Sequence, residues 1–214
     1  MESAEALLQA LLVDPQNEDL AMQLLHQLHE GGDEDVVVRL LQHGTAKLAE
    51  LGAWLASELG SQCAAIYPDV VLHLRHPCWR VRFWLIDCVL ACAGEQQAAD
   101  LATATRLLDD ENSAVRWKAM QFLARASTQQ LEFARDCLSA QRREADLVRG
   151  VSVLADADAG NYDEILPLIH HERALLRKLG GVAAVRARRA QHHLLDVAMA
   201  SDDEEVRSFA KDWL

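Results

Sequence analysis

Apolar residues recur three or four positions apart along most of this chain, and Glu, Gln, Arg and Ala fill many of the positions between them. This spacing is typical of amphipathic helices. β-Branched residues are sparse, and the commonest residues are those with high helix propensity. The four prolines stand near expected helix starts or within short helices. The pattern therefore predicts an all-α protein.

Five segments share one arrangement, in which an aliphatic residue precedes an arginine and apolar residues follow at helical spacing. They cover residues 78–94, 112–127, 145–158, 173–187 and 204–214. The shared arginines are Arg82, Arg116, Arg149, Arg177 and Arg207, which are 34, 33, 28 and 30 residues apart. A further copy 35 residues before Arg82 would place Lys47 at the arginine position. A period of this length indicates a stack of repeats.

A second helical run precedes each copy, over residues 64–74, 96–108, 128–138, 162–171 and 188–200. Short polar turns separate the two runs, most clearly at 109–113 and 201–203, and their Asp, Asn and Ser residues can cap the helix that follows. The expected unit is a helical hairpin that buries its apolar face against the next hairpin.

These copies resemble HEAT repeats, whose second helix opens with an aspartate-containing turn, a Val-Arg pair and a small residue. Val115, Arg116 and Ala119 match that pattern, as do Val206, Arg207 and Ala210. The copies at 142–156 and 173–187 depart from it, with Ser152 and Gly180 in place of the alanine. The resemblance implies a curved α-solenoid of about five to six antiparallel hairpins, a fold that mostly binds other molecules.

Residues 1–43 are helical by pattern but do not show the motif. We expect a divergent acidic cap of two or three helices, broken at Asp14-Pro15 and at Gly31-Gly32. Together with the recognisable repeats over 44–214, this cap would complete one HEAT-like domain over 1–214.

The chain carries 33 acidic and 21 basic residues, a net charge of −12, which weighs against nucleic acid or an anionic membrane as the main partner. Residues 1–60 alone hold 11 acids and two bases. The start is acidic, and no apolar run approaches the roughly 18 residues of a spanning helix. We therefore expect a cytoplasmic protein, with its five cysteines reduced and mostly buried.

Helical geometry at 100° per residue separates a core stripe from an outer face on the second helices. The expected core residues are Val81, Leu85, Cys88, Val89 and Cys92 in one copy, and Val115, Ala119, Phe122, Leu123 and Ala126 in the next. The outer face carries Trp79, Arg80, Phe83 and Asp87, and then Trp117 and Gln121. Phe83 and Trp117 hold the same repeat position. They would form one binding patch on the concave face, or else pack between neighbouring helices. Trp54, Trp84 and Trp213 are expected in the core.

Two sets of histidine-containing residues have a composition that could form a metal site. His73, His76 and Cys78, with Cys88 and Cys92, could be assembled into a zinc site, but helix-end packing suits them better. His29-Glu30 and His171-Glu172 resemble the His-Glu pairs of HEAT-repeat deoxyhypusine hydroxylases. Two such pairs are too few for that di-iron centre. We therefore expect no metal, cofactor or catalytic residue.

Residues 173–189 form a basic run without an acid, which would suit a phosphate-tracking surface like that of the HEAT-like alkylpurine DNA glycosylases. We prefer a face on which these cations pair with neighbouring Asp and Glu.

The favoured function is non-enzymatic protein binding, with Trp79, Phe83 and Trp117 as anchors. The acidic residues Glu30, Asp33, Glu34 and Asp35 would steer a basic partner. Bacterial immunity proteins that neutralise a cationic toxin are similar in general character. The alternatives are a nucleic-acid-binding factor or DNA-repair glycosylase using 173–189, and a cofactor-lyase or chaperone-like HEAT protein.

Overall fold

The structure is a computed structural model that describes residues 3–141 and 143–214. Over these ranges the chain forms helices and turns and no strand. It divides into two compact units, Met1–Cys92 and Ala93–Leu214, which are described separately below. The expectation of one domain over 1–214 stays a prediction.

The first unit contains six α-helices and two 3-10 segments within its described residues. They are α1 (Ala4–Val13), α2 (Glu18–His29), α3 (Asp35–Leu41), α4 (Ala46–Leu59), η1 (Gly60–Ala65), α5 (Tyr67–Val70), η2 (Val71–Arg75) and α6 (Trp79–Cys92). The predicted breaks of the acidic cap are confirmed, because α1 ends before Asp14 and α2 ends before Gly31. Ser3 and Asn17 cap α1 and α2 by accepting hydrogen bonds from backbone N–H groups three residues on.

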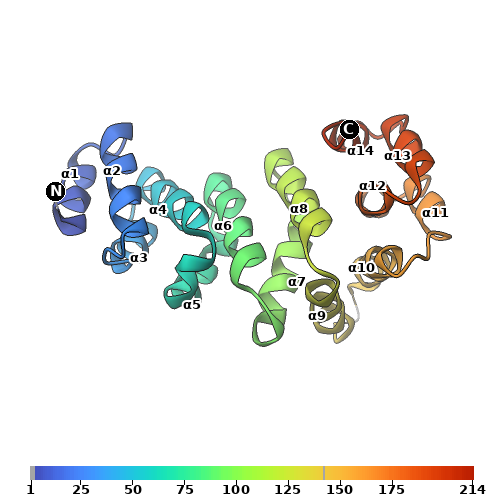
Figure 1. Ribbon diagram of the computed structural model, residues 1–214, viewed down its shortest axis with the longest axis horizontal. Coiled ribbons are helices and arrows are strands. Elements are labelled where there is room, and N and C mark those ends of the chain that lie inside the picture. Colours follow the sequence, from blue (N-terminus) through green and yellow to red (C-terminus); the bar gives the residue numbers. More distant parts are fainter. Residues whose placement is uncertain (1–2, 142) are drawn as a thin grey trace. The chain divides into compact units, whose positions relative to one another are not determined.

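Within this unit α2, α4 and α6 lie side by side in one layer, and α3 and α5 lie in the other (Figure 1). Helix α4 packs on both α3 and α6. The helix expected over 64–74 is instead the short α5 between two 3-10 segments. Pro68 supplies the physical reason, since its ring suits only the first turn of a helix.

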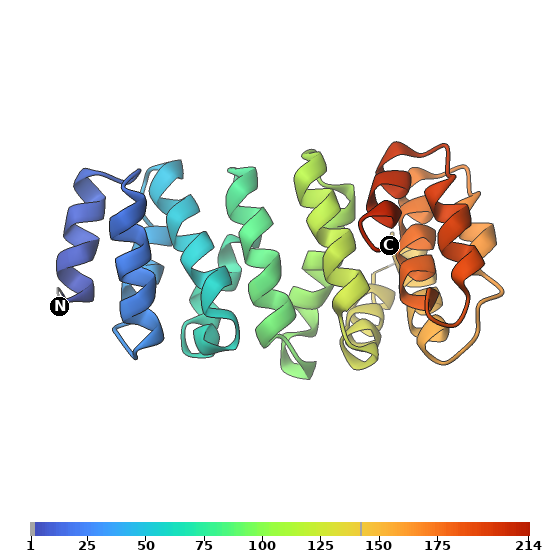
Figure 2. The same cartoon turned by 45° about the horizontal axis from the view of Figure 1, so that its top comes forward.

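Within its described residues, the second unit forms four successive helical hairpins. Its elements are η3 (Glu95–Gln97), α7 (Ala98–Arg106), η4 (Leu107–Asp109), α8 (Ser113–Arg125), α9 (Thr128–Ser139), α10 (Ala145–Asp158), α11 (Ile165–Ile169), α12 (Ala174–Ala187), α13 (His192–Met199) and α14 (Glu204–Lys211). Helices α8, α10, α12 and α14 are the predicted Arg-bearing second helices. Each follows the first helix of its own hairpin (Figure 2). The predicted core stripes of α6 and α8 are confirmed, apart from Cys92, which is half-buried.

The shared arginine closes the turn in front of its own helix. Nη1 of Arg82 donates to the carbonyls of His76 and Pro77, at 2.7 and 3.1 Å. Arg116, Arg177 and Arg207 likewise donate to the carbonyl six residues earlier, at 2.8, 3.0 and 2.7 Å. The repeat position is therefore occupied by a cation that satisfies turn carbonyls otherwise left without a helical partner.

The same turns share a second hydrogen bond. The side chain of the residue six before the arginine accepts from the backbone N–H two residues on. His76, Asp110, His171 and Ser201 all do so, at 2.9 to 3.2 Å. His43 makes this bond to Thr45 at 3.4 Å before α4. The same turn structure therefore recurs before these helices, although the accepting side chain is a histidine, an aspartate or a serine.

Two copies depart from this arrangement. Counting from His43, the arginine position in α4 is Ala49, so the assignment of Lys47 to it is wrong. Lys47 is exposed and reaches Glu50 on its own helix, at 4.0 Å. Arg149, in the copy already noted as degenerate, pairs with Glu164 at 2.9 Å.

Helix α14 packs on α12, α13 and α8, so the last hairpin also contacts a hairpin other than its neighbour. Arg186 links α12 to α8 as well, because its Nη1 donates to the carbonyls of Leu123 and Ala126 at the end of α8, both at 2.8 Å. Those carbonyls belong to the group that a helix end leaves without partners. In the part of the chain that the structure describes, no helix is both long and apolar enough to cross a membrane.

Candidate protein-binding groove

A groove of about 430 Å³ opens on the layer formed by α2, α4 and α6 in the first unit. It is lined by Pro15, Gln16, Asn17, Glu18, Ala21, Met22, Lys47, Glu50, Leu51, Trp54 and Trp84. Pro15, Gln16 and Asn17 form the turn before α2, and Glu18, Ala21 and Met22 lie on the first turns of α2. The other lining residues lie on α4 between Lys47 and Trp54, and on α6 at Trp84. The groove therefore crosses three second helices, over the N-terminal halves of α2 and α6 and past the middle of α4.

The apolar part of the groove is formed by Trp54, Trp84, Leu51 and Met22. Both tryptophans are half-buried, so the expectation that they belong to the core is wrong. Met22 is 55% exposed. Both rings therefore remain partly open to solvent on the side that faces the groove.

Charged residues border these rings. Glu18 and Lys47 stand at the first turns of α2 and α4, and Glu50 lies one turn further along α4. The Glu50 carboxylate is 3.6 Å from Nε of Arg80 and 4.0 Å from Nζ of Lys47. The rim can therefore contact a polar or charged ligand while the rings contact an apolar one.

The predicted anchors Trp79 and Phe83 adjoin this groove without lining it. The Trp79 and Phe83 rings meet edge to face, with centroids 6.4 Å apart, and Phe83 meets Trp84 in the same way at 5.0 Å. The Arg80 guanidinium lies over the Trp79 ring, 4.8 Å from its centroid. These contacts connect the predicted anchors to Trp84, and thereby to the groove.

The remaining predicted anchors lie elsewhere. Asp87 is half-buried one turn beyond Phe83 on α6, and Trp117 and Gln121 are half-buried on α8 in the second unit. A joint surface of Phe83 and Trp117 stays a prediction. Trp213 was expected in the core but is half-buried beneath the Arg188 guanidinium, 4.9 Å from its ring centroid.

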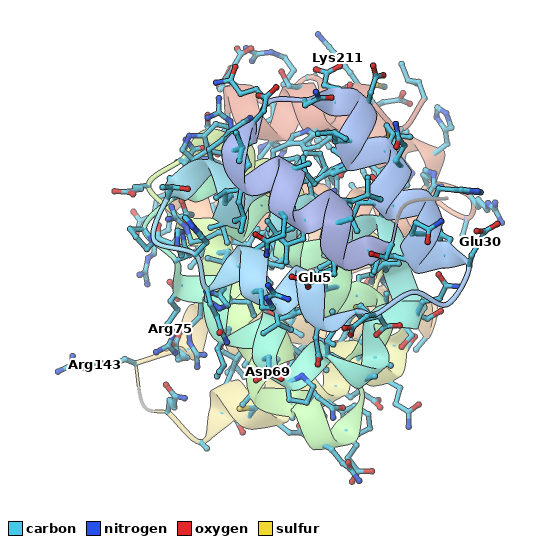
Figure 3. The ribbon with its side chains drawn as sticks, turned by 90° about the vertical axis from the view of Figure 1, so that its left-hand side faces the viewer. Glu5, Glu30, Asp69, Arg75, Arg143 and Lys211 are labelled. Carbon is cyan, nitrogen blue, oxygen red and sulfur yellow. The ribbon has the colours of Figure 1, made fainter. Side chains whose placement is uncertain are left out.

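The predicted acidic cluster is at the far end of α2 from the groove. Glu30 and Asp33 are exposed between α2 and α3, and Asp35 is exposed at the start of α3; Glu30 is labelled in Figure 3. A helix of 12 residues is about 18 Å long, which sets the separation between the two ends. Glu34 does not fit the steering role, because its Oε2 atom is buried with no hydrogen-bond partner among the described residues.

The histidines weighed as metal ligands have structural roles. Nδ1 of His76 accepts from the Cys78 N–H at 3.1 Å, and His29 bonds Gln62 at 2.8 Å. Burial, together with the nearby His76, lowers the pKa of His73. Among the described residues, no group of three or more His, Cys, Asp or Glu side chains is arranged to hold a metal ion.

The basic run over 173–189 is engaged inside the second unit. Arg173 pairs with Asp146, Arg177 with Asp203, Lys178 with Glu205 and Arg186 with Asp158. Arg188 donates to the Val185 carbonyl at 2.7 Å. The preferred pairing with neighbouring acids is thus confirmed for four of the six cations of the run.

Neither a family model nor a curated protein matches the sequence. Solved structures do match. An engineered protein of the Northeast Structural Genomics Consortium is similar with a TM-score of 0.56 and 16% identity, over 100% of this chain and 96% of that chain. The designed armadillo repeat protein YIII(Dq)4CqI is similar with a TM-score of 0.51 and 14% identity, over 100% and 98%. The chain is therefore an α-helical repeat solenoid, as predicted. The comparisons do not single out HEAT repeats among such folds.

Proposed function

We propose that this chain is a non-enzymatic scaffold that binds a partner protein through the groove on α2, α4 and α6. The occupant is an extended segment of the partner that inserts one large apolar side chain between Met22, Trp54 and Trp84. A Lys or Arg next to that side chain contacts Glu18 or Glu50. The observation that carries the proposal is the pair of half-buried tryptophans that line an open groove.

The groove has the composition of a recognition site. Its volume lies within the range of small-ligand and anchor pockets, and a few polar groups surround an apolar centre. Tryptophan is enriched among interface residues that dominate binding energy. An apolar anchor alone would leave Glu18 and Glu50 facing it, so the partner needs polar or cationic groups beside the anchor.

Charge supports a basic partner. Residues 1–92 hold 13 acids against five bases, and the exposed Glu30, Asp33 and Asp35 belong to the same unit. Long-range attraction of this kind raises the association rate more than the final affinity. We therefore assign Glu30, Asp33 and Asp35 to steering and the groove to binding.

Two finer hypotheses belong to this proposal. Membership of the HEAT family is supported by the Val-Arg turns at Arg116 and Arg207, and a basic toxin neutralised by an immunity protein would be one suitable occupant. The nucleic-acid alternative is less well supported, since four of the six cations of 173–189 that it needs pair with acids of this chain.

Selection from a random peptide display library, followed by titration of labelled peptides, tests the proposal. Selected peptides should share a large apolar residue flanked by Lys or Arg. Met22→Lys should weaken binding about tenfold or more, because it places a cation at the open mouth of the groove. Leu72→Lys is the matched control, since Leu72 is 76% exposed in the same unit and lies outside the groove.

The affinity of the Leu72→Lys variant for the selected peptides should stay within about twofold of that of the unchanged protein. Peptides that bind Met22→Lys and the unchanged protein equally well would place the binding surface elsewhere. Enrichment of acidic peptides would contradict the charge argument.

A further inference from the structure

Three cysteines that are scattered in the sequence gather at the end of α6. Cys63 lies on η1, and Cys88 and Cys92 lie on successive turns of α6. The Sγ atoms of Cys63 and Cys92 are 3.5 Å apart. Cys63 and Cys88 are fully buried and Cys92 is half-buried. Cys88 and Cys92 were predicted from the α6 stripe, but nothing in the sequence placed Cys63 beside them.

The three thiols differ in acidity. The hydrogen bond from Cys88 lowers the pKa of Cys63 to about 7, against the opposing effect of burial and with a further hydrogen bond from Cys92. Burial, followed by the charge of Cys63, raises the pKa of Cys92 to about 12. The Cys88 pKa is also raised, first by its hydrogen bond to Cys63 and then by burial. At neutral pH, Cys63 is therefore the thiol that ionises.

We propose that Cys63 and Cys92 are a reversible redox pair, which a small peroxide oxidises to an intramolecular disulfide. Their sulfur atoms already lie within about 1.5 Å of the disulfide bond length of roughly 2.05 Å. A rotation of either side chain could cover that distance. Cys63 lies just after α4 and Cys92 is the last residue of α6, and both come after the residues of these helices that line the groove. This inference is therefore independent of the proposed function.

The reaction takes two steps. The Cys63 thiolate attacks one oxygen of hydrogen peroxide, so that an S–O bond forms, the O–O bond breaks and hydroxide leaves, taking a proton from solvent. The Cys92 sulfur then attacks the resulting sulfenic acid. The S–S bond forms, the S–O bond breaks, and the departing hydroxide takes the Cys92 proton to become water. Two thiols and one peroxide thus yield one disulfide and two waters, with two electrons transferred.

Access to Cys63 requires only a local opening. It lies in a short 3-10 segment in which Gly60 is half-buried and Ser61, Gln62, Ala64 and Ala65 are exposed. Short 3-10 segments have poorer hydrogen-bond geometry than α-helices, and such segments open locally more readily than the core. Peroxide can then reach the thiolate without unfolding of α4 or α6.

Intact-mass measurement after peroxide treatment, denaturation and N-ethylmaleimide labelling tests the proposal. The five cysteines of the reduced protein should all be labelled, and the oxidised protein should carry two labels fewer. Dithiothreitol should restore the full number. Trypsin should then place the bond between peptide 48–75, which holds Cys63, and peptide 83–106, which holds Cys88 and Cys92. This mapping needs no variant.

Variants identify the partner of Cys63. Cys92→Ala should abolish the disulfide and leave a Cys63 sulfenic acid that dimedone traps. Cys88→Ala should slow disulfide formation but should not prevent it, since it removes one hydrogen bond that the Cys63 thiolate accepts. Cys137 lies in the second unit, so the Cys137→Ala variant should form the disulfide as the unchanged protein does. Unchanged labelling of all five cysteines after peroxide would overturn the proposal, as would a disulfide that survives Cys92→Ala and is lost in Cys88→Ala.

Discussion

Arg116 of α8 and Glu205 of α14 are 89 residues apart and form a direct ion pair. Nε of Arg116 lies 3.0 and 3.1 Å from the two carboxylate oxygens of Glu205. Nζ of Lys178, which is buried on α12, lies 3.0 Å from the same carboxylate. One acid therefore joins three second helices of the second unit. In a regular repeat stack each hairpin contacts only its neighbours. Because this carboxylate joins hairpins that are not neighbours, we expect the second unit to unfold more cooperatively than such a stack.

Replacing Glu205 with Gln should lower the free energy of unfolding by about 2 kcal/mol, because Lys178 and Arg116 would lose their charged acceptor while partly buried. Urea denaturation followed by circular dichroism measures this change. Glu204→Gln is the matched control. Its side chain is 77% exposed and pairs with Arg207 on the same helix, so the loss should stay below about 0.5 kcal/mol. Equal losses in the two variants would argue against a special role for Glu205.

The same carboxylate predicts a pH dependence. Burial would raise the pKa of Glu205, but hydrogen bonds from Arg116 and Lys178 more than offset it, so the folded-state pKa lies below the ordinary 4.5. A depressed pKa contributes stability above the unfolded-state pKa, and that contribution disappears as the pH falls through the folded-state value. The stability difference between the unchanged protein and Glu205→Gln should therefore be constant near neutral pH and shrink below about pH 4.5. A difference that persists at about pH 2 would contradict this assignment.

The arginine of the repeat turn should matter more than an exposed arginine nearby. Arg82 is 7% exposed and donates to two turn carbonyls before α6. Arg82→Met keeps much of the side-chain volume and removes the donor, so we expect a loss of about 1–3 kcal/mol in thermal or urea unfolding. Arg75→Met, on an exposed side chain in the same unit, should change stability by about 0.5 kcal/mol or less.

The helices and the repeat were predictable because both depend on local spacing. The second helices α6, α8, α10, α12 and α14 each begin within one residue of the segment predicted from the aliphatic-Arg pattern. The shift of the pattern from Lys47 to Ala49 was not predictable, because no arginine marks the position and only the hydrogen bond from the Thr45 N–H to His43 shows that the turn is the same. Likewise, the contact of α14 with α8 depends on how successive hairpins rotate, which spacing does not encode.

The candidate groove was predicted only in part. Helical phase placed Trp79, Arg80 and Phe83 on the outer side of α6, and they adjoin the groove. It could not show that Trp54 and Trp84 are half-buried, because a residue near the edge of the apolar stripe is covered or exposed according to how far the next helix extends. Nothing in the sequence marked Met22 as a binding residue, because it was only one residue of a predicted amphipathic helix. Cys63 was missed for a related reason, since it belongs to a 3-10 segment without helical phase.

Gly180 illustrates a departure from the repeat that the packing requires. It replaces the usual alanine on α12, and a Cβ there would lie 2.5 Å from the Ile169 nitrogen and 2.8 Å from the Leu168 carbonyl carbon. Both are backbone atoms of α11, so no side-chain rotation can relieve the clash. Gly180→Ala should destabilise the protein by about 2 kcal/mol or more, although alanine favours a helix by about 1 kcal/mol over glycine. Thermal unfolding measures the change. Gly44→Ala, where nothing lies within 4 Å, should leave the midpoint nearly unchanged.

The acidity of Cys63 predicts a distinctive pH profile for its alkylation. The thiolate is the reacting form, and a pKa of about 7 in place of the ordinary 9 makes it abundant at neutral pH. The rate of iodoacetamide labelling in the native protein should rise about tenfold per pH unit below pH 7 and level off above it. Local opening of η1 scales the rate equally at each pH, so it changes the height of the curve and not its midpoint. Mass spectrometry of peptide 48–75 measures the rate, and the urea-unfolded protein should show a midpoint near 9. A native profile that continues to rise to pH 9 would mean that Cys88 and Cys92 do not stabilise the thiolate.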